Sequence, residues 1–182
     1  MKTIIAAVAV CALSATAAYA SLSVGASAPD FTAQASLGGK EFTFSLADAL
    51  KKGPVVLYFY PAAYTPGCTQ EAHDFAEATD RFKAMGATVI GVSHDNIATL
   101  DKFSVSDCRS KFPVAADPDQ KVIKEYDAVL AKKPEYADRT SYVITPDHKV
   151  AFTYTNLAPD AHVALTIQAV QDWNDTHGKK HK

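Results

Sequence analysis

The sequence predicts an α/β fold in which a mixed central sheet is flanked by helices, with a hairpin at its N-terminal side. Val55–Tyr60 (VVLYFY) is a continuous apolar run, typical of a strand that is buried on both faces. Strand and helix patterns alternate through the middle of the chain, and two strand patterns joined by a turn follow between Ser141 and Thr155. The sheet is therefore expected to combine parallel and antiparallel strands.

The elements before the central strand are short. Phe31–Ala35 and Glu41–Phe44 flank the turn Gly38-Gly39, and this pattern predicts a two-stranded hairpin. Ser45 is a residue type that caps helices, and a helical turn is expected directly after it, at Leu46–Lys51.

After the central strand the apolar residues recur with helical spacing. The segment Cys68–Lys83 predicts an amphipathic helix. Its apolar face is formed by Ala72, Phe75, Ala76, Thr79 and Phe82. A strand at Thr88–Val92, a helix at Asn96–Val105, a short strand at Phe112–Ala115 and a short helix at Gln120–Tyr126 are expected to follow.

The C-terminal part of the chain predicts a hairpin and a last helix. Ser141–Ile144 and Val150–Thr155 are strand patterns around a Thr-Pro-Asp turn. The last helix is expected at Asp160–Thr176. Its apolar face is predicted to consist of Val163, Ile167, Val170 and Trp173.

The N-terminus resembles a targeting segment. Met1-Lys2 precedes the apolar run Ile4–Leu13, and small residues lead to an A-x-A site at Ala18-Tyr19-Ala20. This is the pattern of a secretory signal peptide, and the run is too short to span a bilayer. Residues 1–20 are therefore expected to be removed, leaving 21–182 as one domain exported to a bacterial periplasm. The net charge of −2 implies neither a nucleic acid nor a membrane as partner.

Removal of the signal peptide would also remove Cys11 and leave two cysteines, Cys68 and Cys108. Disulfides persist in exported proteins, so the pair is either a structural disulfide or a catalytic pair.

Cys68 follows a loop at the carboxyl end of the central strand, where open α/β sheets bind ligands. It lies in the first turn of the predicted helix, where free N–H groups and the helix dipole favour a thiolate. Thr65 is three residues earlier, close enough to face the sulfur. Arg139 would lower the pKa of a nearby thiol, although on spacing alone a surface arginine is the more common explanation.

Pro61, Thr65 and Cys68 form the motif P-x-x-x-T-x-x-C (PAAYTPGC), and in this motif the chain resembles the peroxiredoxins of the AhpC/TSA type. The surrounding LYFYPAAYTPGCTQEAHDF is similar to the PrxQ or bacterioferritin comigratory protein branch. The resemblance extends from about Gly25 to Trp173 and includes APDF, VIGVS.D, FPVAADPD and RTSYVI. The last of these matches the strand that carries the family's active-site arginine, here Arg139.

The resemblance implies a thioredoxin-like (peroxiredoxin) fold without a metal or organic cofactor. The Cys68 thiolate would attack the O–O bond of hydrogen peroxide or an alkyl hydroperoxide and become a sulfenic acid. Thr65 and Arg139 would hold the peroxide oxygens, and Pro61 would shield the sulfenic acid. Glu71, one helical turn after Cys68, would fix Arg139 through a charge-assisted pair.

The chain departs from the family at the resolving cysteine. Many members of the branch have a second cysteine five residues after the first, and this position is His73 here. Others use a cysteine on the next helix, and Cys108 lies at or just past the end of that helix. Cys108 is therefore the expected resolving cysteine, with local unwinding at Cys68, and the alternative is a one-cysteine enzyme. The reductant would be thioredoxin-like, glutaredoxin-like or a small thiol, and the protein a monomer or weak dimer.

A second class of exported thioredoxin-like protein binds copper through C-x-x-x-C and a distant histidine. Here the second cysteine of that motif is replaced by Ala72, so only a sparse site from Cys68, His73 and His94 remains. A non-catalytic redox protein is a third possibility. The set of Pro61, Thr65 and Arg139 favours the peroxidase over both.

Overall fold

The computed structural model describes residues 21–177, so the predicted signal peptide lies outside the described residues. The strands are β1 (Thr32–Leu37), β2 (Lys40–Ser45), β3 (Val55–Phe59), β4 (Thr88–Ser93), β5 (Val114–Ala116), β6 (Thr140–Ile144) and β7 (Val150–Thr155). The helices are α1 (Leu46–Leu50), α2 (Pro66–Ala84), α3 (Ile97–Ser106), α4 (Lys121–Glu125) and α5 (His162–His177).

The strands form one seven-stranded sheet in the order β2-β1-β5-β4-β3-β6-β7. β3 and β4 pair in parallel, as do β4 and β5, whereas β3 and β6 are antiparallel. All five residues of β3 are buried, because helices cover both faces of the sheet at its centre. These features confirm the predicted mixed sheet with its central apolar strand and N-terminal hairpin.

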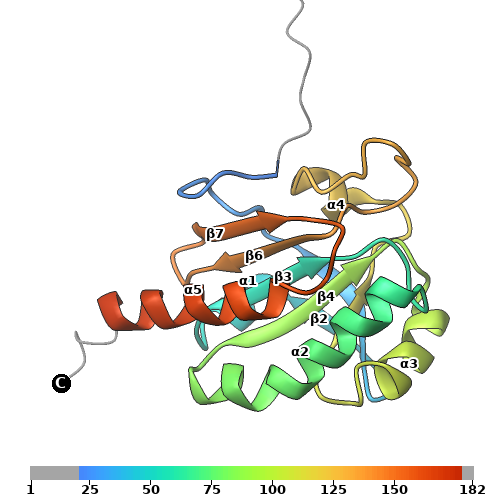
Figure 1. Ribbon diagram of the computed structural model, residues 1–182, viewed down its shortest axis with the longest axis horizontal. Coiled ribbons are helices and arrows are strands. Elements are labelled where there is room, and N and C mark those ends of the chain that lie inside the picture. Colours follow the sequence, from blue (N-terminus) through green and yellow to red (C-terminus); the bar gives the residue numbers. More distant parts are fainter. Residues whose placement is uncertain (1–20, 178–182) are drawn as a thin grey trace, which may run out of the picture.

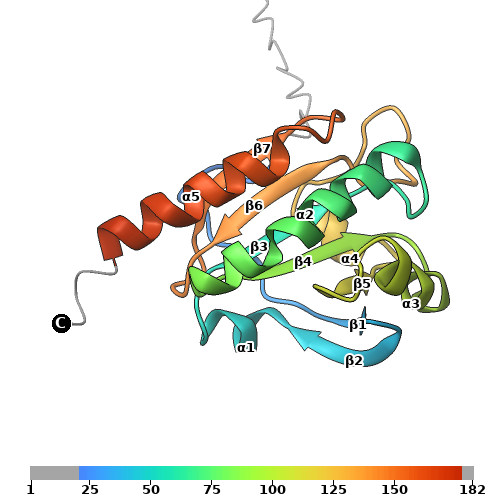
Figure 2. The ribbon, with the colours of Figure 1, turned by 60° about the horizontal axis from the view of Figure 1, so that its bottom comes forward.

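Helices pack on both faces of the sheet. Figure 2 shows α2 and α5 side by side across one face, and α3 packs on the same face next to β1 and β5. The shorter α1 and α4 lie on the opposite face, where their apolar residues join a second core cluster (Figure 1). The predicted apolar face of α2 is buried along its whole length.

Strand pairing determines which loops meet at one edge. Phe59, the last residue of β3, pairs with Thr140, the first residue of β6, and Thr140 also pairs with Thr155 at the end of β7. The segments that follow β3 and β7 and the segment that precedes β6 therefore lie together. Cys68 and Arg139 are brought to the same edge in this way, although they are 71 residues apart.

The helix α5 agrees with the expectation at Ile167 and Val170 and differs from it elsewhere on the buried face. Its buried residues are His162, Thr166, Ile167 and Val170, and the predicted Val163 is only half-buried. A polar face is tolerated here because both ring nitrogens of His162 have partners and Thr166 donates to the His162 carbonyl. Trp173, near the end of the helix, is half-buried and stacks on His177 with ring centroids 5.0 Å apart.

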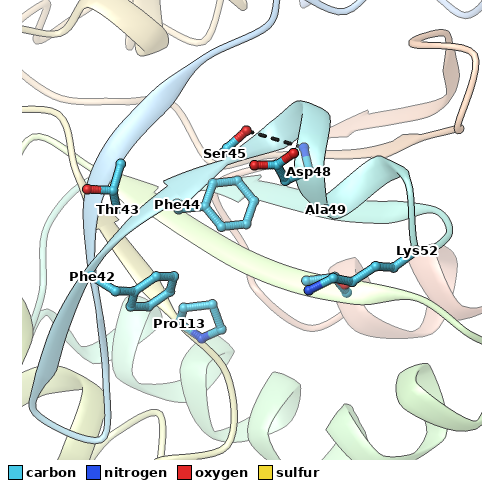
Figure 3. Close-up of a pocket in the computed structure, with 9 residues that line it drawn as sticks. Phe42, Thr43, Phe44, Ser45, Asp48, Ala49, Lys52 and Pro113 are labelled. Atoms are coloured by element: carbon cyan, nitrogen blue, oxygen red, sulfur yellow. Dashed lines mark hydrogen bonds between the residues drawn. The ribbon is translucent and has the colours of Figure 1, made fainter.

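A surface hollow of about 310 Å³ lies between β2 and α1 (Figure 3). Its lining includes Phe42, Lys52 and Pro113, and Ser45 caps α1 beside it by accepting from the Asp48 amide. Thr88, the first residue of β4, also lines the hollow. The hollow is therefore at the end of the sheet opposite Cys68.

Gly91 in β4 allows an aromatic ring to lie against the sheet. Tyr58, its neighbour on β3, stacks on Phe75 of α2 with centroids 4.4 Å apart. Gly91→Ala is expected to lower the free energy of unfolding by about 1–3 kcal/mol, because overpacking has this cost. The cause is that the new Cβ would lie 2.6 Å from the Tyr58 ring. Urea unfolding followed by circular dichroism measures the change.

The control for this prediction is the same substitution in a Tyr58→Leu background, where the ring that the Cβ meets is absent. Gly91→Ala should cost less stability there. A loss below about 0.5 kcal/mol in the otherwise unchanged chain would contradict the overpacking.

Candidate active site

The loop after β3 leads into the N-terminus of α2. Thr65 is the N-cap, with extended backbone, and Pro66 occupies the first helical turn, where its fixed φ suits the helix. This is why α2 begins two residues before the predicted Cys68. The first intrahelical bond joins the Thr69 amide to the Thr65 carbonyl at 2.9 Å, so the amides of Gly67 and Cys68 have no partner within the helix.

Cys68 lies under the guanidinium of Arg139. Nη2 of Arg139 donates to the Cys68 sulfur at 3.4 Å, and the two residues are 2 % and 3 % exposed. Gly67 provides the space for this approach, because a Cβ at that position would lie 3.0 Å from Nη2. A permanent positive charge therefore lies beside the sulfur, in the first turn of α2, at the positive end of the helix dipole.

Arg139 is fixed from three sides. Nε donates to the Leu157 carbonyl at 2.9 Å, Nη1 donates to Oε2 of Glu71, and Nη2 donates to Cys68. Its own backbone amide donates to the side chain of Asp138 at 2.8 Å. The guanidinium is thus held in one orientation by α2 and by the loop after β7.

Glu71 is fully buried. Burial raises the pKa of its carboxyl to about 8, while the nearby Arg139 favours the ionised form. Oε2 accepts from Arg139, but the buried Oε1 has no hydrogen-bond partner among the described residues. Burial and the guanidinium of Arg139 therefore act on the pKa of the Glu71 carboxyl in opposite directions.

Thr65, the N-cap of α2, is exposed. Its hydroxyl donates to the Ala62 carbonyl at 3.0 Å. Because that bond uses the single proton of the hydroxyl, the oxygen remains available as an acceptor.

Pro61 is half-buried, and the end of β4 supports the loop that it begins. The Pro61 carbonyl lies 2.9 Å from Nδ1 of His94, which donates to it. Oδ2 of Asp95 accepts from the Ala63 amide and from the Ser93 hydroxyl, both at 2.8 Å. His94 and Asp95 therefore fix the loop that carries the motif. The sequence did not predict this role for either residue.

Cys108 lies just past the end of α3 and is completely buried, and both Cys68 and Cys108 are free thiols. Burial raises the pKa of the Cys108 thiol, and the adjacent Asp107 raises it further. Both sulfurs belong to the same core cluster, between the sheet and the helices α2, α3 and α5. Neither is open to solvent.

Three side-chain contacts tie the Cys108 segment to α2, and we call them the α2 clasp. They are His73–Asp107 at 3.8 Å, Glu77–Arg109 at 3.0 Å and Asp80–Lys111 at 3.5 Å. Within this segment, Arg109 and Ser110 have φ values of 49° and 54°, in the left-handed region that disfavours L-residues other than glycine. The segment is thus both strained and held in place.

The copper alternative is not assembled in this arrangement. His73 contacts Asp107 and His94 contacts Pro61. Over residues 21–177, no three His, Cys, Asp or Glu side chains are grouped as metal ligands. The helices within the same residues are also too short or too polar to cross a membrane.

Sequence reasoning missed His162 altogether. It is fully buried on α5, with Nδ1 3.7 Å from Oε1 of Glu71. The apolar periodicity indicated Ile167 and Val170 on the buried face of α5, but it gave no sign that a histidine is buried there too.

Comparison with known proteins identifies the family. Residues 24–153 match the AhpC/TSA family. The chain is 34 % identical over 151 residues to chloroplastic peroxiredoxin Q of Oryza sativa subsp. japonica, an alignment that covers 82 % of this chain and 67 % of that protein. It is 35 % identical over 155 residues to the putative peroxiredoxin bcp of Helicobacter pylori, covering 82 % and 98 % of the two chains.

Solved structures agree with this result. Peroxidoxin BcpB of Mycobacterium tuberculosis superposes with a TM-score of 0.74 and 30 % identity, over 82 % of this chain and 96 % of that one. PrxQ of Xylella fastidiosa gives a TM-score of 0.75 at 22 % identity, over 85 % and 98 %, and shows the shared fold. The chain therefore belongs to the AhpC/TSA family, the peroxiredoxins, and is a peroxidase of the oxidoreductase class.

Proposed function

We propose that the chain reduces hydrogen peroxide and alkyl hydroperoxides, with Cys68 as the peroxidatic cysteine. One observation carries the proposal: the Cys68 sulfur lies in the first turn of α2 and receives an N–H from Arg139, which Glu71 holds. The positive charge and the free helix amides stabilise the thiolate, which is the nucleophilic form of the side chain.

In the first step the thiolate attacks one peroxide oxygen. An S–O bond forms and the O–O bond breaks, and the departing oxygen leaves with the electron pair and takes up a proton as water or an alcohol. Cys68 becomes a sulfenic acid. Arg139 stabilises the charge that develops on the departing oxygen, and the Thr65 oxygen accepts the hydrogen bond of the peroxide O–H.

In the second step the Cys108 thiol attacks the sulfenic acid of Cys68, so an S–S bond forms and water leaves. The shared core cluster of the two cysteines supports this pairing. The burial of both sulfurs means that the start of α2 and the segment with Arg109 and Ser110 must open first. A thioredoxin-like or glutaredoxin-like dithiol or a small thiol then reduces the disulfide.

Export to a periplasm is a further part of the proposal and depends on residues 1–20 alone. The names of the rice and wheat relatives state that those proteins are chloroplastic, so they do not support it. N-terminal sequencing of the secreted protein is expected to begin at Ser21. We also propose that the protein is a monomer or a weak dimer. Sedimentation of the reduced protein measures its oligomeric state.

The first test is intact mass after the reduced protein meets one equivalent of peroxide. We expect a loss of two hydrogens within one chain, because the disulfide forms. In Cys108→Ser, the same treatment should add one oxygen at Cys68. Addition of oxygen in the unchanged chain, with Cys108 still free, would mean a one-cysteine enzyme. No reaction would contradict the peroxidase itself.

Arg139→Lys tests the role of the guanidinium. A lysine cannot make the contacts of Nε, Nη1 and Nη2 together, so the second-order rate constant for peroxide is expected to fall by about 10²–10³-fold. Stopped-flow kinetics measures it. Arg81→Lys, an exposed arginine of α2, is the matched control and should change the rate little. An equal effect in both variants would argue against a role for Arg139.

The α2 clasp is expected to slow disulfide formation. Glu77→Gln combined with Asp80→Asn removes two of its contacts, each worth about 0.2–1 kcal/mol for an exposed pair, so the disulfide should form about 2- to 30-fold faster. The rate of sulfenic acid formation should not change. Glu125→Gln with Asp172→Asn removes the same charge elsewhere and should leave both rates unchanged. A slower disulfide in the clasp variant would overturn the prediction.

A further inference from the structure

Tyr64, in the loop before α2, has two features that the proposed steps do not use. Its backbone is left-handed, with a φ of 64°, a conformation that is unfavourable for a residue with a Cβ. Its ring meets the ring of Phe103 edge-on, with centroids 5.3 Å apart. A residue other than glycine keeps such a backbone conformation only where its surroundings hold it.

Phe103, the partner of Tyr64, lies in the last turn of α3 and is completely buried. Its ring stacks on that of Tyr60, with centroids 5.8 Å apart. Its carbonyl accepts from two amides, that of Asp107 at 3.0 Å and that of Cys108 at 3.1 Å. Tyr64 therefore contacts the residue that fixes both the end of α3 and the backbone of Cys108.

The neighbours of Tyr64 in the chain attach it to the active-site loop. The amide of Ala63, directly before it, donates to Asp95 at 2.8 Å, and Thr65, directly after it, is the N-cap of α2. Figure 2 shows the start of α2 and the helix α3 at the same end of the sheet. The Tyr64 ring therefore joins the start of α2 to the last turn of α3.

We propose that Tyr64 is a positioning residue that couples the release of the two cysteines. Its ring on Phe103 holds the loop before α2 and the segment after α3 closed together. Its left-handed backbone favours the release of both, because φ can return to a negative value once the loop opens. The inference rests on the proposed function, in which both sulfurs leave the core before the disulfide forms.

The ring and the backbone of Tyr64 act in opposite directions, so variants can separate them. Tyr64→Ala removes the ring and keeps a Cβ, and with it the unfavourable left-handed conformation. Tyr64→Gly removes both the ring and the strain. Tyr64→Phe keeps the ring. Because the side chain is 51 % exposed, all three variants are expected to fold.

Alkylation of Cys108 by iodoacetamide in the reduced protein tests the ring without peroxide. Cys108 is completely buried, so it reacts only when its segment opens, and peptide mass mapping separates it from Cys68. Tyr64→Ala is expected to react about 2- to 10-fold faster at Cys108, because the edge-on aromatic contact is lost. Tyr64→Phe is the matched control and should react at the unchanged rate. An unchanged rate in Tyr64→Ala would overturn the proposal.

Comparison of Tyr64→Gly with Tyr64→Ala tests the backbone, since both variants lack the ring. Glycine adopts the left-handed conformation freely, so Cys108 should react about three- to tenfold more slowly in Tyr64→Gly than in Tyr64→Ala. Faster reaction in the glycine variant would mean that chain freedom, not strain, controls opening, and would overturn the proposal. Asp127→Gly relieves a left-handed residue directly after α4 and should leave the rate unchanged. An equal slowing there would indicate global stability instead.

A Phe103→Leu background tests the partner of the ring. Tyr64→Ala should cause no additional change there, because the contact is already gone, and an equal additional effect would overturn the coupling. Should Phe103→Leu fail to fold, the variants of the exposed Tyr64 decide alone. Since alkylation needs no peroxide, the expected rates in a protein that consumes no peroxide would refute the proposed function and leave this inference standing. Unchanged alkylation with normal disulfide formation would refute the inference alone.

Discussion

The arrangement of this site depends on one side chain, the guanidinium of Arg139. Its three nitrogens reach Cys68, Glu71 and the Leu157 carbonyl, so one rigid planar group joins the segment just before β6, the start of α2 and the loop after β7. Removing such a buried charge from water is costly, and the cost is offset because each of the three nitrogens has a hydrogen-bond partner. The sheet order that puts β6 beside β3 is what makes these contacts possible.

The fold and the site differ in how far the sequence predicted them. The apolar run of β3 and the helical spacing of α2 are local signals, and both elements were predicted within two residues. The approach of Arg139 to Cys68 depends on pairing between strands far apart in the chain, which no local pattern encodes, so only the family resemblance indicated it. The buried face of α5 was predicted only in part: Ile167 and Val170 are buried as expected, but apolar spacing cannot reveal that His162 is buried with them, where Ser141 and Asn156 satisfy its ring.

Reactivity and stability make opposite demands on the two cysteines. Packing both sulfurs in the core stabilises the reduced protein, yet the proposed chemistry requires them to leave it. The backbone strain lies directly after Cys108, where Arg109 and Ser110 have unfavourable conformations, and it would favour opening of this segment. Exposed charge pairs hold the segment closed. Exposed pairs are weak and reversible, which suits a contact that must open in each turnover.

The stacking of Trp173 on His177 has an optical consequence. Trp173 is the single tryptophan of the chain, and it lies near the end of α5, beside the turn between β6 and β7. The aromatic rings near the two cysteines are instead those of Tyr58 and Tyr60. Intrinsic tryptophan emission therefore monitors the C-terminal helix and its neighbouring turn. The redox chemistry at Cys68 would have to be followed by tyrosine absorbance or by an introduced fluorophore.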